Sequence, residues 1–387
     1  MFYSTDTCPR ANILKMKKSI LTLLLVGWAS LVLAQHNPYI SRVYDFRPAP
    51  GQFINTLPPW TEGDTEEDMI SKANDCLVDN NQEMICLGGF GGYVVFGFDH
   101  PIVNVRGEYD MQIDGNAFYS ESNPSSTTAL GGSSEPGIVM VSCDDNGNGL
   151  PDDEWYELAG SDYYKAETVH NYKITYYRTP ADHVATPHPT NRMLNDTSFV
   201  RWTANDTITG YIAKNVYHRQ NYYPNWIEED SITFCGTKLA NNAVDESGKG
   251  TYYVLYCFDW GYADNHPNTT DMSKFNIDWA VDSEGNHVDL DQIDFVKVYT
   301  AVNQYAGWLG ETSTEILNAY DLHPDEEPTA VKNIENREQR TENKSQTSNL
   351  NPQILYDLSG RRVAATEAAH GVYIRKTPGR TTKILIK

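Results

Sequence analysis

The feature that most constrains the fold is a series of short strand-like runs that continues over most of the chain. Residues 93–98, 172–177, 252–258 and 294–299 are rich in β-branched and aromatic side chains, which favour strands. Turn-forming Gly, Asn, Asp and Pro residues separate these runs. Many short strands with turns between them predict an all-β fold, and we favour a jelly-roll-like β-sandwich.

In one segment near the start of this region, the apolar residues recur with the spacing of a helix and not with that of a strand. Within residues 63–80, Met69, Ile70, Ala73 and Leu77 fall on one face of a helix. Acidic residues immediately before this face, including Asp68, are typical of a capped helix start. The sequence therefore predicts one short N-terminal helix in an otherwise β-rich domain.

A loop at residues 144–155 carries oxygen-bearing side chains at alternate positions, as calcium loops of the EF-hand type do. Trp155 occupies the position of the usual closing glutamate, so Asp153 or Glu154 would complete the shell. We predict a Ca²⁺ site between two strands, and a metal-free Asn/Gly-rich turn is the alternative. The candidate ligands are Asp144, Asn146, Asn148, the carbonyl group of Leu150, Asp152, Asp153 and Glu154.

Three later stretches combine tryptophan with acidic or amide side chains. Aromatic rings stack on the apolar faces of sugars, and carboxylates bind hydroxyl groups, so this mixture suits a carbohydrate surface. The alternative is that Trp260 and Trp279 fill the core while the acids cap turns. The predicted ligand-binding residues are Asp259, Trp260, Asp264, Asp278, Trp279 and Trp308.

The ends of the chain carry different signals. Residues 1–34 predict a secretory signal peptide whose true start is Met16, with a basic region, a short apolar run and a small-residue cleavage site ending at Ala34. The apolar run of this signal is short for a stable span, and no transmembrane span is expected in the mature chain. Five cysteines follow; we would test Cys235 and Cys257 first as a disulfide, although buried free thiols are favoured.

Charge and composition indicate a class of partner to exclude and how the mature chain is divided into domains. The formal net charge is −22, which disfavours nucleic acid as a partner. We expect a β-sandwich surface domain over residues 35–324. A polar, apolar-poor stretch at 325–353 predicts a flexible linker, and three strand-like runs at 354–387 predict a small basic β module.

Two resemblances extend these expectations. The runs at 356–363, 371–374 and 383–387 resemble the C-terminal sorting domain of the Bacteroidota type IX secretion system. That resemblance implies passage across the outer membrane, with the type IX machinery as partner, and release or anchoring at the cell surface. Residues 88–93 and 146–155 are similar to an uncharacterised family of Bacteroidota cell-surface proteins. Relatives in that family occur among nutrient-uptake proteins, some of them near corrinoid-uptake systems.

These observations predict an exported, calcium-stabilised cell-surface or extracellular protein that binds a glycan or other nutrient without converting it. The alternatives are a corrinoid-binding accessory protein, a secreted glycoside hydrolase or lyase, and a structural or adhesive protein. No Gly-x-Ser-x-Gly, His-Glu-x-x-His or Walker motif appears, so we predict no catalytic residue and favour a binder over an enzyme. Two close carboxyl groups in a deep cleft, one with a raised pKa, would favour a hydrolase.

Overall fold

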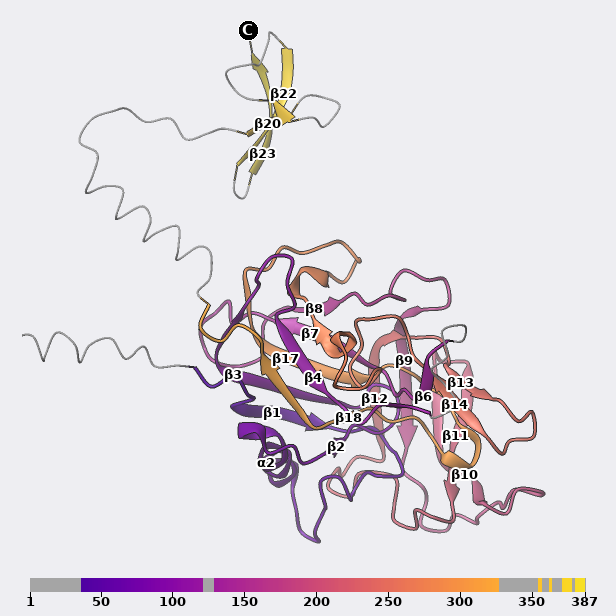
Figure 1. The fold of residues 1–387 in the computed structure, drawn as a ribbon. Helices are drawn as coiled ribbons and strands as arrows, with labels where there is room; N and C mark the ends of the chain where they lie inside the picture. The colour runs from indigo at the N-terminus through magenta and orange to yellow at the C-terminus, as the bar shows by residue number, and fades with distance from the viewer. Residues whose placement is uncertain are drawn as a thin grey trace, which may run out of the picture. The chain divides into compact units, whose positions relative to one another are not determined.

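The computed structural model describes residues 36–120 and 129–326, and the backbone of four strands between residues 354 and 386. The chain divides into two compact units, Met1–Pro328 and Thr329–Lys387. We call the described part of the first unit the body and the four strands of the second unit the C-terminal module. Figure 1 shows the body as a β-rich structure with a single short α-helix at one side.

The largest sheet of the body has six strands and contains the centre of the core. Strands β3 and β17 are buried along most of their length, as expected for strands that are covered on both faces. Val296 pairs with both Phe96 and Val141, so three apolar strands lie in register. The order is β1 (Arg42–Arg47), β3 (Tyr93–Val103), β17 (Gln292–Thr300), β7 (Gly137–Ser142), β8 (Trp155–Leu158) and β16 (Ala280–Val281).

A second sheet of four strands has one solvent-facing side. In β12, Ile232 and Phe234 are buried while Ser231, Thr233 and Cys235 are exposed, which is the alternation of a half-buried strand. The order is β11 (Ile208–Asn215), β10 (Leu194–Ala204), β9 (Val169–Tyr177) and β12 (Ser231–Lys238).

Smaller sheets complete the body. One has the order β13 (Ala243–Asp245), β14 (Tyr253–Tyr256), β6 (Gly131–Ser133) and β5 (Phe118–Tyr119). A second has the order β15 (Lys274–Phe275), β4 (Met111–Asp114) and β19 (Asn318–Asp321), and a third pairs β18 (Glu315–Ile316) with β2 (Ile85–Cys86). Short 3-10 turns connect some of these strands: η1 (Val78–Asn80), η2 (Asp271–Ser273), η3 (Ile277–Trp279) and η4 (Gly307–Leu309).

The predicted helix is α2 (Glu66–Leu77). Thr65 and Asp68 form a reciprocal capping box, which fixes the first turn as the sequence pattern indicated. Met69, Ala73 and Leu77 are buried on its inner face. Cys76 is buried as well, whereas Ile70 is only partly covered, so the buried face is slightly rotated from the predicted one.

The glycine-rich stretch between β2 and β3 forms a tight turn against the chain near Ala49. Gly88 has a φ of +70°, and a Cβ atom there would lie 1.9 Å from the carbonyl oxygen of Ala49. Only glycine fits such a close backbone approach. The stretch is therefore a tight turn between β2 and β3.

The all-β class is confirmed by this predominance of strands in the described residues. The finer prediction of a jelly-roll sandwich stays a prediction. The five cysteines of the body are free, so Cys235 and Cys257 form no disulfide with each other, and Cys235 is exposed.

The two ends of the body lie side by side. Tyr39 pairs with Tyr320 as an isolated β-bridge, and the backbone N–H of Asp321 donates to the carbonyl oxygen of Pro38 over 2.8 Å. The first described segment is therefore fixed against the last strand, β19.

The C-terminal module contains one more strand than the sequence predicted. Its sheet has the order β21 (Arg362–Val363), β20 (Ile354–Tyr356), β22 (Gly371–Thr377) and β23 (Arg380–Ile386). The predicted signal peptide lies outside the described residues, as does the predicted linker beyond residue 326. In the part of the chain that the structure describes, no helix is long and apolar enough to cross a membrane.

Candidate functional site

A short hairpin at residues 305–311 adjoins several hollows of the body. A β-bridge joins Tyr305 to Glu311, and the backbone N–H of Ala306 donates to the carbonyl oxygen of Gly310 over 2.9 Å. Gly307 and Gly310 have φ values of +61° and +104°, which non-glycine residues rarely adopt. The two glycines therefore let the chain reverse within a few residues.

Three adjoining cavities surround this hairpin, and we call them together the Trp308 cleft. Their volumes are about 1080, 510 and 310 Å³. The first and second share Trp308 in their lining, while the second and third share Glu311. The cleft thus has an aromatic side chain in its wall and a carboxyl group in its floor.

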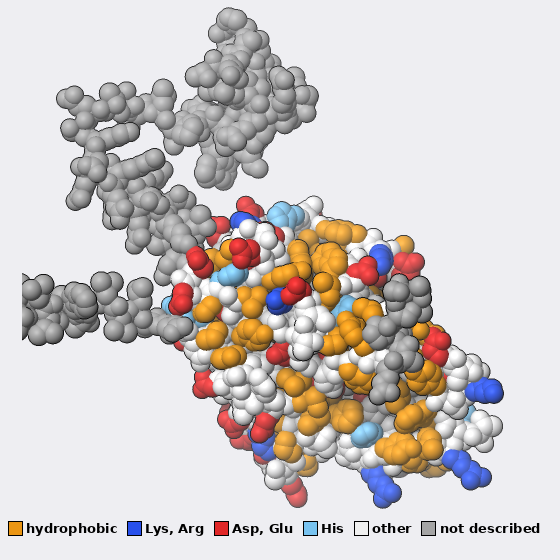
Figure 2. Space-filling model, in the orientation of Figure 1, with side chains coloured by type: hydrophobic (Ala, Val, Ile, Leu, Met, Phe, Trp, Pro, Cys, Tyr) orange, Lys and Arg blue, Asp and Glu red, His pale blue; other side chains and the backbone are white. Residues whose placement is uncertain are grey.

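The walls of the cleft come from elements that are far apart in sequence. Tyr211 lies on β11, Tyr253 begins β14, and Tyr217 follows β11. The rings of Tyr217 and Trp308 are 6.0 Å apart between centroids and tilted by 60°. Figure 2 shows apolar side chains gathered at this end of the face in view, over β10, β11 and β14, with Lys and Arg at its edge. Such a wall offers several ring faces to one ligand.

Glu311 is a buried acid with an unsatisfied oxygen. Its Oε1 accepts a hydrogen bond of 2.5 Å from the backbone N–H of Gln52, while Oε2 has no hydrogen-bond partner among the described residues. Burial raises the pKa of Glu311 from 4.5 to about 8. Near neutral pH this side chain therefore holds a proton, and Oε2 lacks the hydrogen-bond partner that a protonated carboxyl group can use.

A second group of acids lies behind the cleft. Carboxyl oxygens of Glu135, Asp264 and Glu315 all lie within 4.8 Å of one another. Burial raises the pKa of each carboxyl group, and the nearness of the other acids raises it further. Glu135 also lines the second cavity of the cleft, so it shares that cavity with Glu311.

The structure places Asp264, a predicted ligand-binding residue, in the interior of this group. Its Oδ1 accepts hydrogen bonds from the backbone N–H groups of Asn116 and Ala117 over 2.7 and 2.8 Å. Its Oδ2 accepts from the backbone N–H of Glu315 over 3.0 Å. Asp264 thus joins three chain segments in a buried position.

Four other predicted ligand residues lie away from the Trp308 cleft. The rings of Trp260 and Trp279 pack with 4.7 Å between centroids. Asp278 forms an ion pair with Arg106, and Asp259 is exposed. None of these four lines any of the three cavities of the cleft. Trp260 keeps 37% of its surface exposed, so this pair remains a separate aromatic surface.

Trp308 is the one predicted ligand residue that the structure places in the cleft. Sequence reasoning missed its tyrosine neighbours, because they come from separate strands and turns. It also missed Glu311, whose only local signal is its position directly after Gly310 at the end of a Gly-Trp-Leu-Gly stretch. A buried carboxyl group is not distinguished by sequence from the many exposed acids of this chain.

The predicted calcium loop connects β7 to β8, so it lies between two strands as expected. Asp144 Oδ1 accepts from the backbone N–H of Asn148 over 3.0 Å, and Asn146 Nδ2 donates to Asp152 Oδ1 over 2.9 Å. Oδ2 of Asp153 is buried and has no hydrogen-bond partner among the described residues. A cation beside Asp153 would satisfy this oxygen, so the donor set fits calcium.

The other predicted ligands of this loop all have hydrogen-bond partners within or beside it, including Glu154 and Leu150. Glu154 Oε2 accepts a hydrogen bond of 3.1 Å from the hydroxyl group of Tyr156, and the Leu150 carbonyl accepts one of 2.9 Å from Asp152. Asp294, which sequence reasoning did not single out, accepts from the backbone N–H of Asp144 over 2.8 Å and so fixes the start of the loop.

Calcium is expected to raise the melting temperature of metal-depleted protein, because an ion bound only by the folded state stabilises it by about 2.7 kcal/mol at a hundredfold excess over Kd. The measurement is differential scanning calorimetry with and without CaCl₂, on wild type and Asp152→Asn. Asp282→Asn, in another exposed Asp/Asn/Gly turn, is the control and should respond as wild type does. An equal response in all three proteins, or none, would exclude this loop as the site.

Comparison with known proteins does not assign a function to this arrangement. No protein-family model matches the chain, and no curated protein matches it as a relative. The functional argument therefore depends on the geometry described above.

Proposed function

We propose that this chain is an exported cell-surface protein that binds a glycan in the Trp308 cleft. The observation that carries the proposal is the set of aromatic side chains that line adjoining cavities around one rigid hairpin. Sugars present flat apolar faces to aromatic rings and hydroxyl groups to polar side chains. The protonated Glu311 in the floor can both donate to and accept from a hydroxyl group.

Several predictions from the sequence belong to the same proposal. Secretion through the type IX system, calcium bound at 144–155 and a jelly-roll arrangement of the sheets are all consistent with a rigid extracellular binding module. The acidic net charge of −22 suits such a protein, because it favours solubility and cation binding. A purely structural role is less well supported, since a cavity of about 1080 Å³ is a feature of ligand-binding proteins.

A glycan array probed with the full chain tests the proposal, with cobalamin as an additional ligand for the corrinoid alternative. Trp308→Ala is expected to weaken any glycan hit about fivefold or more, because truncation of an aromatic binding residue costs more than about 1 kcal/mol. Trp260→Ala is the matched control, since Trp260 is also an accessible tryptophan but lies outside the cleft. Loss of binding in Trp260→Ala alone would instead place the ligand on the Trp260–Trp279 surface.

A secreted glycoside hydrolase is the second candidate, favoured by one specific observation. Glu135 and Glu311 line the same cavity, and both have raised pKa values because they are buried. A hydrolase needs one protonated and one ionised carboxyl group, whereas burial favours the protonated form of both here. Binding is therefore the better-supported function. If the wild-type protein released sugar from a glycan that it binds and Glu311→Gln did not, hydrolysis would become the better-supported function.

A further inference from the structure

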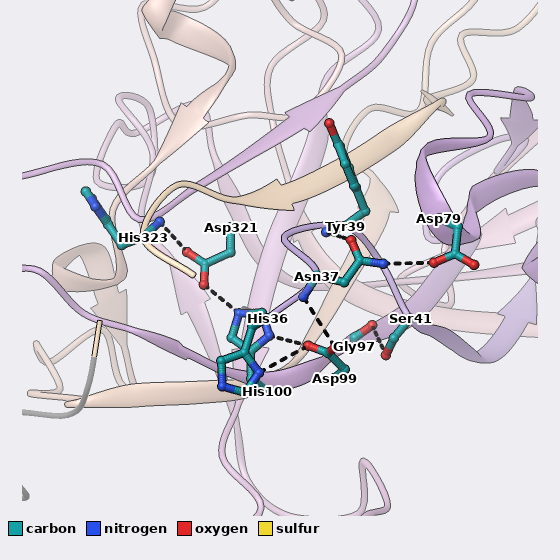
Figure 3. Close-up of polar contacts among 10 residues, drawn as sticks. All are labelled: His36, Asn37, Tyr39, Ser41, Asp79, Gly97, Asp99, His100, Asp321 and His323. Atoms are coloured by element: carbon teal, nitrogen blue, oxygen red, sulfur yellow. Dashed lines mark hydrogen bonds and ion pairs between the residues drawn. The ribbon is translucent and has the colours of Figure 1, made fainter. Parts of the chain in front are cut away.

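A cluster of histidine and aspartate lies where the two ends of the body meet. Figure 3 shows His36, Asp99 and His100 converging, with Asp321 on the far side of the His100 ring. His100 Nδ1 is 2.5 Å from Asp99 Oδ1, and His36 Nδ1 is 3.6 Å from the same oxygen. One donor atom from each of these three residues lies within 4.8 Å of the other two.

The ring of His100 is held from behind by a buried carboxylate. His100 Nε2 is 2.8 Å from Asp321 Oδ2, and the Asp321 side chain is only 1% exposed. Asp321 Oδ1 accepts a hydrogen bond of 2.7 Å from the backbone N–H of His323. Metal-binding histidines commonly donate their second ring N–H to a carboxylate, which fixes the orientation of the ring. His100 therefore already has the support that a metal ligand needs.

Asp99 is supported in the same way. Its Oδ2 accepts a hydrogen bond of 3.4 Å from the backbone N–H of Asn37, which leaves Oδ1 directed at the two imidazole rings. The rings of His36 and His100 pack with 4.5 Å between centroids and an angle of 35°. The first described residues thus bring His36 over Asp99 and His100, which lie within β3.

We propose that His36, Asp99 and His100 bind a zinc ion, with Asp321 as a positioning residue. Donors about 2.0 Å from one tetrahedral ion are roughly 3.3 Å apart. Asp99 Oδ1 lies 2.5 Å from His100 Nδ1 and 3.6 Å from His36 Nδ1, so ion binding requires Asp99 to move back slightly from His100. The Asp99 side chain is 45% exposed and its hydrogen bond from Asn37 is long at 3.4 Å, which leaves room for that movement. Two imidazoles and one carboxylate leave the fourth position of the ion to water.

The donor set distinguishes this site from the calcium loop. Imidazole nitrogen suits zinc and copper, whereas calcium and magnesium take oxygen ligands. Asp99 and Asp321, together with Glu108 near His323, give the surroundings a negative charge that favours a cation. The bound ion would connect the first residues of the body, through His100 and Asp321, to its last strand.

Isothermal titration calorimetry with ZnCl₂ tests this proposal, using the full chain without a polyhistidine tag. Wild type is expected to bind one zinc ion, and His36→Ala to lose at least tenfold in affinity. His36 lies at the exposed start of the body, so its removal should not disturb folding. His287→Ala, which removes an exposed histidine elsewhere, is the control and should bind as wild type does. Equal affinity in His36→Ala and wild type, or no zinc binding by wild type, would overturn the proposal.

The pH dependence provides a second readout. Ionised carboxylates only accept hydrogen bonds, so without metal His100 must be protonated on both nitrogens to satisfy Asp99 and Asp321. Zinc must displace the Nδ1 proton, so affinity should increase as pH rises from 6 to 8. Affinity that is independent of pH over this range would contradict ligation by His100.

Discussion

Glu311→Gln is expected to reduce the loss of stability that the wild-type protein undergoes between pH 5 and pH 9. Burial raises the pKa of Glu311 from 4.5 to about 8, so the folded state keeps a proton that the unfolded chain releases. The associated stabilisation is fully present below pH 4.5 and is lost as pH rises through 8. Each pKa unit corresponds to about 1.4 kcal/mol, so the contribution of this single residue is a few kcal/mol.

Glutamine is the informative replacement because it cannot ionise and still offers Oε1 to the backbone N–H of Gln52. Urea denaturation at several pH values measures the free energy of unfolding directly. Glu135, Asp264 and Glu315 also have raised pKa values, so some pH dependence will remain in the variant. Glu62→Gln, at an exposed position, is the control and should follow wild type. Parallel pH profiles for Glu311→Gln and wild type would show that Glu311 is ionised in the folded protein.

Gly307→Ala is expected to destabilise the protein and to weaken ligand binding without removing any aromatic side chain. A Cβ atom at Gly307 would lie 2.3 Å from Cε2 of Tyr253, and the φ of +61° is unfavourable for alanine. The backbone strain alone costs about 1–2 kcal/mol. The steric overlap adds to this cost, because either the hairpin or the Tyr253 ring must move.

The variant Gly107→Ala separates the cost of backbone strain from the cost of steric overlap. Gly107 has a φ of +84°, yet a Cβ atom there would meet nothing within 4 Å. This control should therefore show the backbone cost without the overlap, and it should leave binding unchanged. Thermal unfolding gives the stability change, and titration with the best array ligand gives the change in affinity. If Gly307→Ala matched Gly107→Ala in both measurements, the hairpin would not position the cleft.

The sequence predicted the elements whose signals are local. The helix at 66–77 was found because its capping residues and its apolar face are separated by three or four positions. The loop at 144–155 was placed between two strands for the same reason, since its turn residues and flanking strands are contiguous. Such patterns depend only on neighbours along the chain.

The cleft could not be predicted in this way, because its parts meet only after folding. Tyr211 and Tyr253 belong to different sheets. Trp308 lines the same cavity from a hairpin more than fifty residues further along the chain than Tyr253. The tryptophan pair at 260 and 279 gave an equally good sequence signal, yet its members pack on each other. Burial of Glu311 depends on the same long-range packing.

The position of the chain ends has a consequence for how large ligands could approach. Asp321 lies beside Pro38, so the chain enters and leaves the body at one side, while Figure 1 shows β10, β11, β13 and β14 at the opposite side. The strands that line the Trp308 cleft therefore lie on the side of the body away from Pro38 and Asp321. A polysaccharide that extends beyond the cleft would meet these strands and not the two ends of the body.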